Sequence, residues 1–153
     1  MFAKLFLQYV LAAAFGVGMD EGYATVYGTP EDTNLSESGR MACTHREVPQ
    51  NEKLCAHRWL PCGTEVVVVN LEHDGVTTCK VADRGPFGKT KGGQWRGIID
   101  LTPGAAKGAR LDGRDLVRIL YKLPPAGHKV YTDARFLTPK SMRRALRSRQ
   151  PQT

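Results

Sequence analysis

Four consecutive valines, at residues 66–69, constrain the fold of this chain more than any other feature. They lie in a strand predicted at residues 64–70. Because they do not alternate with polar residues, both faces of that strand are expected to be buried, as in a barrel wall. Asp74 and Gly75 then form the core of a hairpin turn, and residues 76–81 alternate well enough to make the returning strand. The sequence therefore predicts a central β-hairpin.

Short strands dominate the rest of the central region. Residues 22–28, 97–101 and 116–123 are rich in β-branched and apolar residues and are expected to be strands. Thr102 and Pro103 suit the start of one short helix, with Thr as the N-cap and Pro in the first turn. Several short strands with little helix indicate a mostly β protein built as a small barrel.

The N-terminus has the pattern of an export signal. Lys4 precedes an apolar run at residues 5–15, and small residues at 12–18 suit cleavage. The run is shorter than the roughly 20 apolar residues that a membrane span needs. We expect residues 1–18 to be a signal peptide with an uncertain cleavage site, and the product to be periplasmic or secreted. The alternative is an uncleaved anchor, which would be the chain's link to a membrane.

The positive charge of the chain is concentrated at its C-terminus. The formal net charge is +7, and no acid separates the basic residues Lys140, Arg143, Arg144, Arg147 and Arg149. Such a tail could bind nucleic acid, anionic lipid or anionic wall polymer, or form a solvated helix. Export argues against a nucleic-acid partner. Residues 124–153 are therefore expected to be a basic extension outside the barrel.

The four cysteines all lie in the central region. In an oxidising compartment they are expected to form disulfides, and three pairings are open. We favour Cys43–Cys62, because both flank an irregular excursion before the valine strand, with Cys55–Cys79 as the second pair.

A zinc site is the competing explanation for these cysteines. Cys43 and Cys55 each precede a histidine by two residues, at His45 and His57, which offers two sulfurs and two imidazoles. The spacing matches none of the usual zinc patterns. We expect neither a metal nor a cofactor.

The returning strand of the hairpin leads into Asp83-Arg84-Gly85-Pro86. The Gly-Pro pair turns the backbone away and leaves Asp83 at the end of a strand. Taken alone, such a turn is more often an ordinary surface feature than a site. Its neighbours along the chain change that interpretation.

Five segments follow one another along the chain, at residues 22–28, 56–64, 66–71, 83–87 and 98–102. They include Ala56-His57-Arg58-Trp59, Asp83-Arg84-Gly85-Pro86-Phe87 and Ile98-Ile99-Asp100-Leu101-Thr102. In this order they resemble the rare-lipoprotein-A-like family, which is related to expansin and barwin domains. The resemblance covers residues 22–123. It implies a six-stranded double-psi β-barrel with an open polysaccharide-binding groove.

Enzymatic members of that family are lytic transglycosylases that act on peptidoglycan. The resemblance places their catalytic acid at Asp83, with His57 beside it; the alternative for His57 is to satisfy buried backbone. A further family acid precedes the histidine, but here the matching residues 43–47 depart from the pattern. Glu47 or Glu52 would have to substitute for it.

The remaining site predictions concern binding and support. Asp100 is flanked by apolar residues and is expected to be structural, because buried carboxylates are rarely left unpaired. Arg84 is expected to point away from the groove, since a paired cation would hold Asp83 ionised. The candidates for substrate binding are Tyr27, Arg58, Arg84, Phe87 and Trp95.

Two functions from different classes remain open. The first is an exported, monomeric lytic transglycosylase that cleaves peptidoglycan glycan strands and leaves anhydro-muramyl products. The second is a non-catalytic expansin-like or barwin-like domain that binds or loosens wall polysaccharide. Asp83 and His57 favour the enzyme, whereas the missing upstream acid favours the binder.

Overall fold

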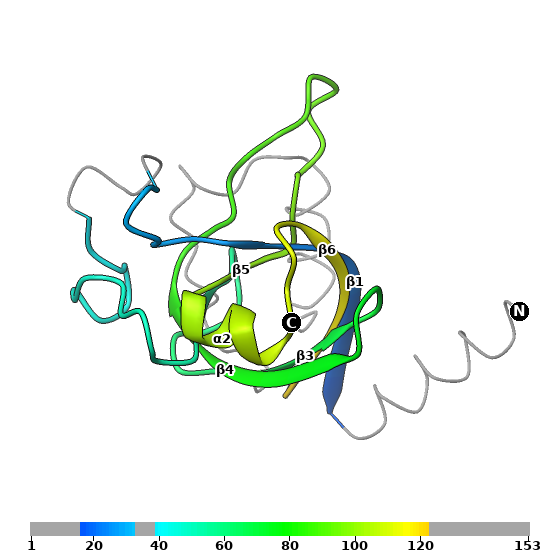
Figure 1. Ribbon diagram of the computed structural model, residues 1–153, viewed down its shortest axis with the longest axis horizontal. Coiled ribbons are helices and arrows are strands. Elements are labelled where there is room, and N and C mark those ends of the chain that lie inside the picture. Colours follow the sequence, from blue (N-terminus) through cyan, green and yellow to red (C-terminus); the bar gives the residue numbers. More distant parts are fainter. Residues whose placement is uncertain (1–15, 33–38, 123–153) are drawn as a thin grey trace, which may run out of the picture.

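Six strands close into a barrel in the computed structural model, which describes residues 16–32 and 39–122 (Figure 1). The order around the barrel is β1-β5-β2-β4-β3-β6. The β1–β5 and β2–β4 pairs are parallel and the other neighbours are antiparallel. The prediction of a mostly β protein with a six-stranded barrel is confirmed. The elements are β1 (Val17–Val26), β2 (Leu54–Ala56), β3 (Glu65–Asn70), β4 (Gly75–Asp83), β5 (Ile99–Leu101), α2 (Pro103–Gly108) and β6 (Asp115–Lys122).

The predicted valine hairpin is strands β3 and β4, paired from Glu65↔Lys80 to Asn70↔Gly75. Val66 and Val68 are fully buried in the core, whereas Val67 and Val69 are half-buried. The expectation of two buried faces was therefore too strong, because the barrel wall has one inner and one outer face. Gly75 allows close packing against α2: a Cβ there would lie 2.2 Å from the Ala109 carbonyl oxygen.

The first strand starts earlier than the sequence indicated. β1 begins at Val17 rather than residue 22, because it pairs with β6 from Val17↔Lys122 to Ala24↔Asp115. The other residues of the expected signal peptide, 1–15, and the basic extension at 124–153 lie outside the described residues. Within the described ranges, no helix is long and apolar enough to span a membrane.

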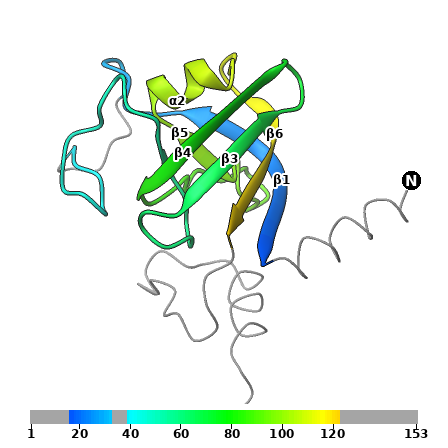
Figure 2. The same ribbon diagram turned by 90° about the horizontal axis from the view of Figure 1, so that it is seen from below.

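The helix α2 lies beside the barrel (Figure 2). Thr102 occupies its N-cap position as predicted, but makes no side-chain cap. Its buried hydroxyl instead donates to the Glu52 carbonyl at 2.6 Å and accepts from the Leu54 N–H at 3.0 Å. Thr102 therefore joins β5 to β2, which carries the histidine segment.

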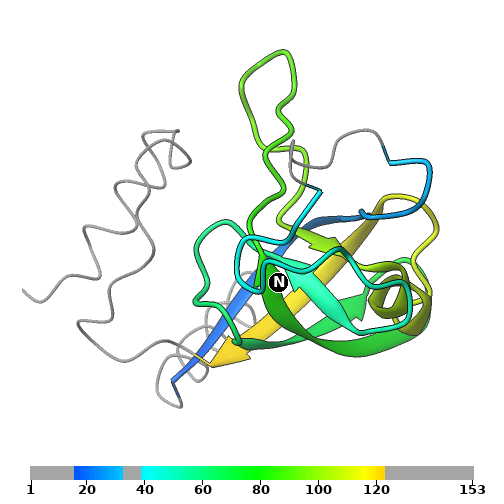
Figure 3. The ribbon, with the colours of Figure 1, turned by 90° about the vertical axis from the view of Figure 1, so that its left-hand side faces the viewer.

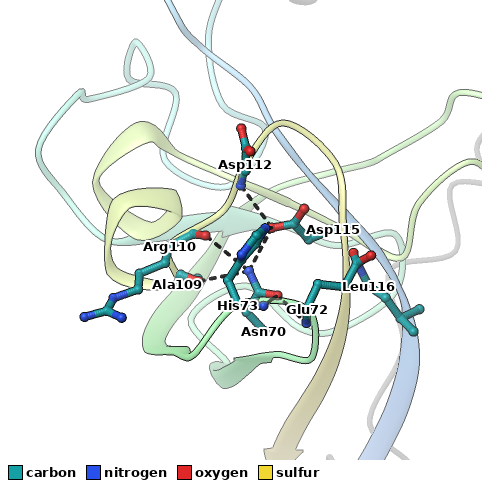
Figure 4. A network of polar contacts seen from close by, with 8 residues as sticks. All are labelled: Asn70, Glu72, His73, Ala109, Arg110, Asp112, Asp115 and Leu116. Carbon is teal, nitrogen blue, oxygen red and sulfur yellow. Dashed lines mark hydrogen bonds and ion pairs between the residues drawn. The ribbon is translucent and has the colours of Figure 1, made fainter.

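The two ends of β4 hold different polar arrangements. At its start, Asn70, His73 and Asp115 belong to a dense network that includes the end of α2 (Figure 4). At its other end, Asp83 leads into the long loop of residues 84–98, which projects from the barrel (Figure 3). This second end carries most of the predicted site residues.

Candidate active site

Asp83 is the last residue of β4, where it pairs with Ala56 of β2. Its side chain is half-buried, and Oδ1 accepts the backbone N–H groups of Ala42 and Arg84, both at 2.8 Å. Burial raises the pKa of Asp83, while the two N–H donors and the Arg84 charge oppose that shift. The net result is a raised pKa, which suits a group that must hold and release a proton.

The side chain of Arg84 turns toward residues 57–62. Its guanidinium donates to the Leu60 carbonyl at 2.8 Å, to the His57 carbonyl at 3.2 Å and to Cys62 Sγ at 3.2 Å. These contacts are all to residues 57–62, and the expectation that Arg84 points away from a glycan groove stays a prediction. The Arg84 charge lowers the pKa of Asp83 only in part, so the carboxyl keeps its raised value.

His57 lies next to Asp83, since its backbone N–H donates to the Asp83 carbonyl at 3.2 Å. Its ring is 3% exposed, and Nδ1 accepts the N–H groups of Trp59 and Leu60 at 3.3 and 3.2 Å. Burial and the charges of Arg58 and Arg84 lower the pKa of His57 to about 3. The imidazole is therefore neutral and engaged with backbone, which favours the supporting role over proton transfer.

Asp100 is a second carboxyl at this end of the barrel, contributed by β5. It pairs with Thr25 of β1 and Ala56 of β2, and the Thr25 hydroxyl donates to its Oδ1. Its Oδ2 lies near Gly85, 3.5 Å from where a Cβ would stand. Burial raises the pKa of Asp100 to about 6, and the neighbouring charges of Asp32 and Asp83 add to the shift.

Tyr27 directly follows β1, close enough to both carboxyls for their charges to act on its hydroxyl. It is 8% exposed, and its hydroxyl has no hydrogen-bond partner among the described residues. Burial raises the pKa of Tyr27, and the charges of Asp83 and Asp100 raise it further. The hydroxyl is itself buried, so Tyr27 belongs to the core beneath the site.

Comparison with known proteins shows what this arrangement resembles. No protein-family model matches the chain. A probable endolytic peptidoglycan transglycosylase RlpA of Treponema pallidum is 29% identical over 127 residues, covering 82% of this chain and 36% of that protein. Its counterpart in Synechocystis is 41% identical over 69 residues, covering 45% and 20%. The chain is similar in sequence to RlpA proteins.

The RlpA similarity confirms the family resemblance seen in the sequence. The Campylobacter jejuni endolytic peptidoglycan transglycosylase RlpA is 37% identical over 68 residues, covering 44% of this chain and 22% of that protein. In these three relatives the chain matches between 20% and 36% of their length.

Two solved structures are also similar in shape. The Streptomyces papain inhibitor has a TM-score of 0.46 and 23% identity, over 67% of this chain and 94% of the inhibitor. The apo expansin of Clavibacter michiganensis has a TM-score of 0.45 and 22% identity, over 72% and 53%.

The two glutamates proposed to replace the upstream acid lie apart from Asp83. Glu47 is exposed and its backbone bridges to Arg40. Glu52 is exposed and forms an ion pair with Arg46 at 2.9 Å; that hydrogen-bonded partner lowers its pKa. By contrast, Asp83 and Asp100 both pair with Ala56 of β2, from its two sides. Asp100 is therefore the carboxyl that lies near Asp83, although the sequence predicted a purely structural role for it.

Two of the aromatic candidates, Phe87 and Trp95, lie on the 84–98 loop. Arg58 is buried and donates through Nη1 to the carbonyls of Pro86 and Gly97, at 2.6 and 2.7 Å, so it closes the base of the loop. Its guanidinium lies 4.6 Å from the Trp95 ring centroid, as does Lys89 Nζ. Phe87 is 37% exposed and packs edge-on against Trp95. Arg58 thus supports the surface that Trp95 and Phe87 present.

One of the two predicted disulfides is present in the structure and the other is not. Cys43–Cys62 is formed, which confirms that prediction. The Cys55–Cys79 bond is wrong, because both are free buried thiols. Cys55 pairs with Val81, two residues beyond Cys79, so the cysteines are diagonal neighbours rather than opposed. Their mutual hydrogen bond and burial raise the pKa of Cys55, which keeps its thiol protonated in the core.

Proposed function

We propose that this protein cleaves the glycan strands of peptidoglycan as a lytic transglycosylase, with Asp83 as its acid–base group. The observation that carries the proposal is the raised pKa of a carboxyl held at a strand end, beside a second carboxyl with a pKa of about 6. The names of the RlpA relatives supply the reaction and the substrate.

The reaction needs one group that first gives and then takes a proton. Protonated Asp83 donates its proton to the glycosidic oxygen while the bond from that oxygen to the muramyl C1 breaks. The C6 hydroxyl of the same muramyl sugar attacks C1, and the Asp83 carboxylate takes the hydroxyl proton. The products are an anhydro-muramyl end and a free hydroxyl, and no water is consumed. A raised pKa lets one carboxyl serve in both steps.

We propose that Asp100 is the second acid of the site, the role that the sequence suggested for Glu47 or Glu52. Two nearby carboxylates disfavour ionisation of both, so Asp100 helps to keep a proton in the site. Tyr27, whose hydroxyl is buried, supports the site from the core, where the charges of Asp83 and Asp100 raise its pKa. His57 then has a supporting role, in which it orders residues 57–60 against the end of β4.

The loop is the proposed contact with the glycan. Phe87 and Trp95 offer apolar ring surface of the kind that stacks on sugars, and Arg58 holds the loop that carries them. Arg84 has an indirect role in binding. Its guanidinium donates to residues 57–62 and holds that segment in place. We further propose export to the cell envelope, with any cleavage before Val17, because β1 begins there.

Incubation with purified peptidoglycan tests the function. The wild-type protein and Asp83→Asn would be compared on wall with stem peptides and on glycan stripped of them, with products identified by mass spectrometry. Anhydro-muramyl products from the wild type alone support the proposal. Binding without products from either protein would instead support the non-catalytic wall-binding function.

A further inference from the structure

Residues 40–47 form a small, self-bonded turn beside the site. The Met41 N–H donates to the Arg46 carbonyl at 2.8 Å, and the His45 N–H donates to the Met41 carbonyl at 2.9 Å. An antiparallel bridge joins Arg40 to Glu47. Met41 is fully buried and anchors the turn, while most of its other residues are exposed.

This turn forms hydrogen bonds with the last two residues of β4. The Cys43 N–H donates to the Ala82 carbonyl at 3.0 Å, and the Ala42 N–H donates to Asp83 Oδ1 at 2.8 Å. Ala42 is 41 residues from Asp83 in sequence. The other N–H on that oxygen comes from the adjacent Arg84 and needs no remote support.

A second segment holds the same end of the strand. The Gly63 N–H donates to the Val81 carbonyl at 2.7 Å, and Arg84 Nη2 donates to Cys62 Sγ at 3.2 Å. The Cys43–Cys62 disulfide joins this segment to the turn of residues 40–47. Each cysteine is thus within two residues of a backbone contact to β4, and the disulfide links the two contacts covalently.

We propose that the Cys43–Cys62 disulfide is a positioning device that keeps the Ala42 N–H on Asp83, so that the thiol–disulfide state of the surroundings controls the site. The inference rests on the proposed role of Asp83. Cys62 is exposed, so an external dithiol can reach the bond. The dithiol supplies two electrons and two protons, the S–S bond breaks to give two thiols, and the reagent becomes a cyclic disulfide.

Loss of the Ala42 hydrogen bond should change the pKa of Asp83 in a known direction. The Ala42 N–H favours the carboxylate form of Asp83, so its loss moves the pKa of Asp83 further upward. Arg84, Asp100, Tyr27 and the neutral His57 are the other titratable groups near this carboxyl. Arg84 also donates to Cys62 Sγ, and because its charge lowers the pKa of Asp83, a loosened Arg84 would move that pKa in the same upward direction. If Asp83 acts as the acid, the falling limb of the pH–rate profile moves to higher pH. The rate falls about 10–100-fold because the acid is no longer held in place.

The test compares oxidised wild-type protein with protein treated with dithiothreitol, with reduction verified by thiol alkylation and intact mass. The Asp83 pKa is followed by carboxyl NMR, and kcat/KM on purified glycan is followed against pH. On reduction we expect the Asp83 pKa and the falling limb of the kcat/KM profile to move to higher pH, and the maximal kcat/KM to fall about 10–100-fold. Cys43→Ser/Cys62→Ser reproduces the reduced state and ignores dithiothreitol, whereas Cys79→Ala keeps the wild-type response.

Ala42→Pro gives a second route, since it removes the N–H with the disulfide intact and is expected to raise the Asp83 pKa in the oxidised protein. An unchanged Asp83 pKa and pH profile on verified reduction would overturn the inference. Collapse of the barrel on reduction, seen by circular dichroism, would contradict it as well, because the disulfide would then hold the fold. The NMR titration needs no turnover, so a pKa shift in a protein inactive on peptidoglycan would reject the proposed function alone.

Discussion

An aspartate lies at or beside each end of strand β4, and the two are in opposite electrostatic states: Asp83 ends β4, and Asp115, the first residue of β6, lies near its start. At the start of the strand, Asp115 is 5% exposed and accepts Asn70 Nδ2 at 2.8 Å and the Asp112 N–H at 2.9 Å, with His73 Nε2 at 3.8 Å (Figure 4). Burial raises the pKa of Asp115, but these donors and the His73 charge outweigh it and lower the pKa below its usual value.

At the other end, the balance goes the opposite way. Asp83 accepts two backbone N–H groups and Asp100 accepts the Thr25 hydroxyl, yet burial dominates and raises both pKa values. Asp100 also faces like charge from Asp83 and Asp32. Burial alone therefore does not make a carboxyl reactive. The donors and charges around it decide whether it is a structural anion or a proton carrier.

Replacement of the two aspartates in turn should give the largest contrast. Asp83→Asn is expected to lower transglycosylase activity by about 10²–10⁴-fold, the usual worth of an acid–base group. Asp115→Asn should keep activity within about twofold, because Asp115 lies at the far end of β4. Anhydro-muramyl product yield measures both. Equal losses in the two variants would abolish the distinction between the ends.

The stability that Asp100→Asn gains over the wild-type protein should depend on pH. A carboxyl whose pKa rises from its usual 3.8 to about 6 on folding releases its proton less readily when folded. Stability is then lost as pH rises from about 4 to 6 and stays low above that. Asp100→Asn removes the loss, so it should gain on the order of 3 kcal/mol over wild type at pH 8 and nothing near pH 3. Urea unfolding at several pH values measures this, and a gain that shrinks as pH rises would refute it.

Loss of Asn70 should make the structural end resemble the site. Asn70→Ala removes the 2.8 Å donor to Asp115, so the Asp115 pKa should rise. The variant is expected to lose about 1–3 kcal/mol of stability, because it leaves a buried carboxylate with fewer donors. A group whose pKa is lowered on folding stabilises above its unfolded pKa, so the loss should be seen at pH 7 and fade as pH falls through the folded pKa. Chemical denaturation across that range checks it, and a pH-independent loss would point to packing instead.

Replacement of Glu52 should have the smallest effect. Its side chain is exposed and paired with Arg46, away from the groups that tune Asp83. Glu52→Gln and Glu47→Gln are both expected to retain activity within about twofold on purified peptidoglycan. A hundredfold loss in either would return the second acid to the segment before His57.

Local sequence signals predicted the parts of the molecule that are built from neighbouring residues. The valine hairpin follows from residues 64–81 alone, and it is this hairpin that carries Asp83 to a strand end. The start of β1 could not be found this way, since residues 17–21 become a strand by pairing with β6, about a hundred residues later.

The arrangement of the site could not be predicted from local sequence either, because it depends on pairing between distant strands. Asp100 was assigned to structure because its two apolar neighbours suggest a buried strand, and it does lie in one. Its place beside Asp83 depends on β5 pairing with β2 and β2 with β4, which no local pattern reveals. Likewise, Cys55 and Cys79 had the right partners but the wrong register for a bond.

A carboxyl NMR titration of all three aspartates in one sample tests the central claim most directly. The account predicts that Asp83 and Asp100 titrate above the usual aspartate value, with Asp100 near 6, and that Asp115 titrates below it. An Asp83 that titrates at or below Asp115 would contradict the account, because the proposed acid would then hold no proton at the pH where it must donate one.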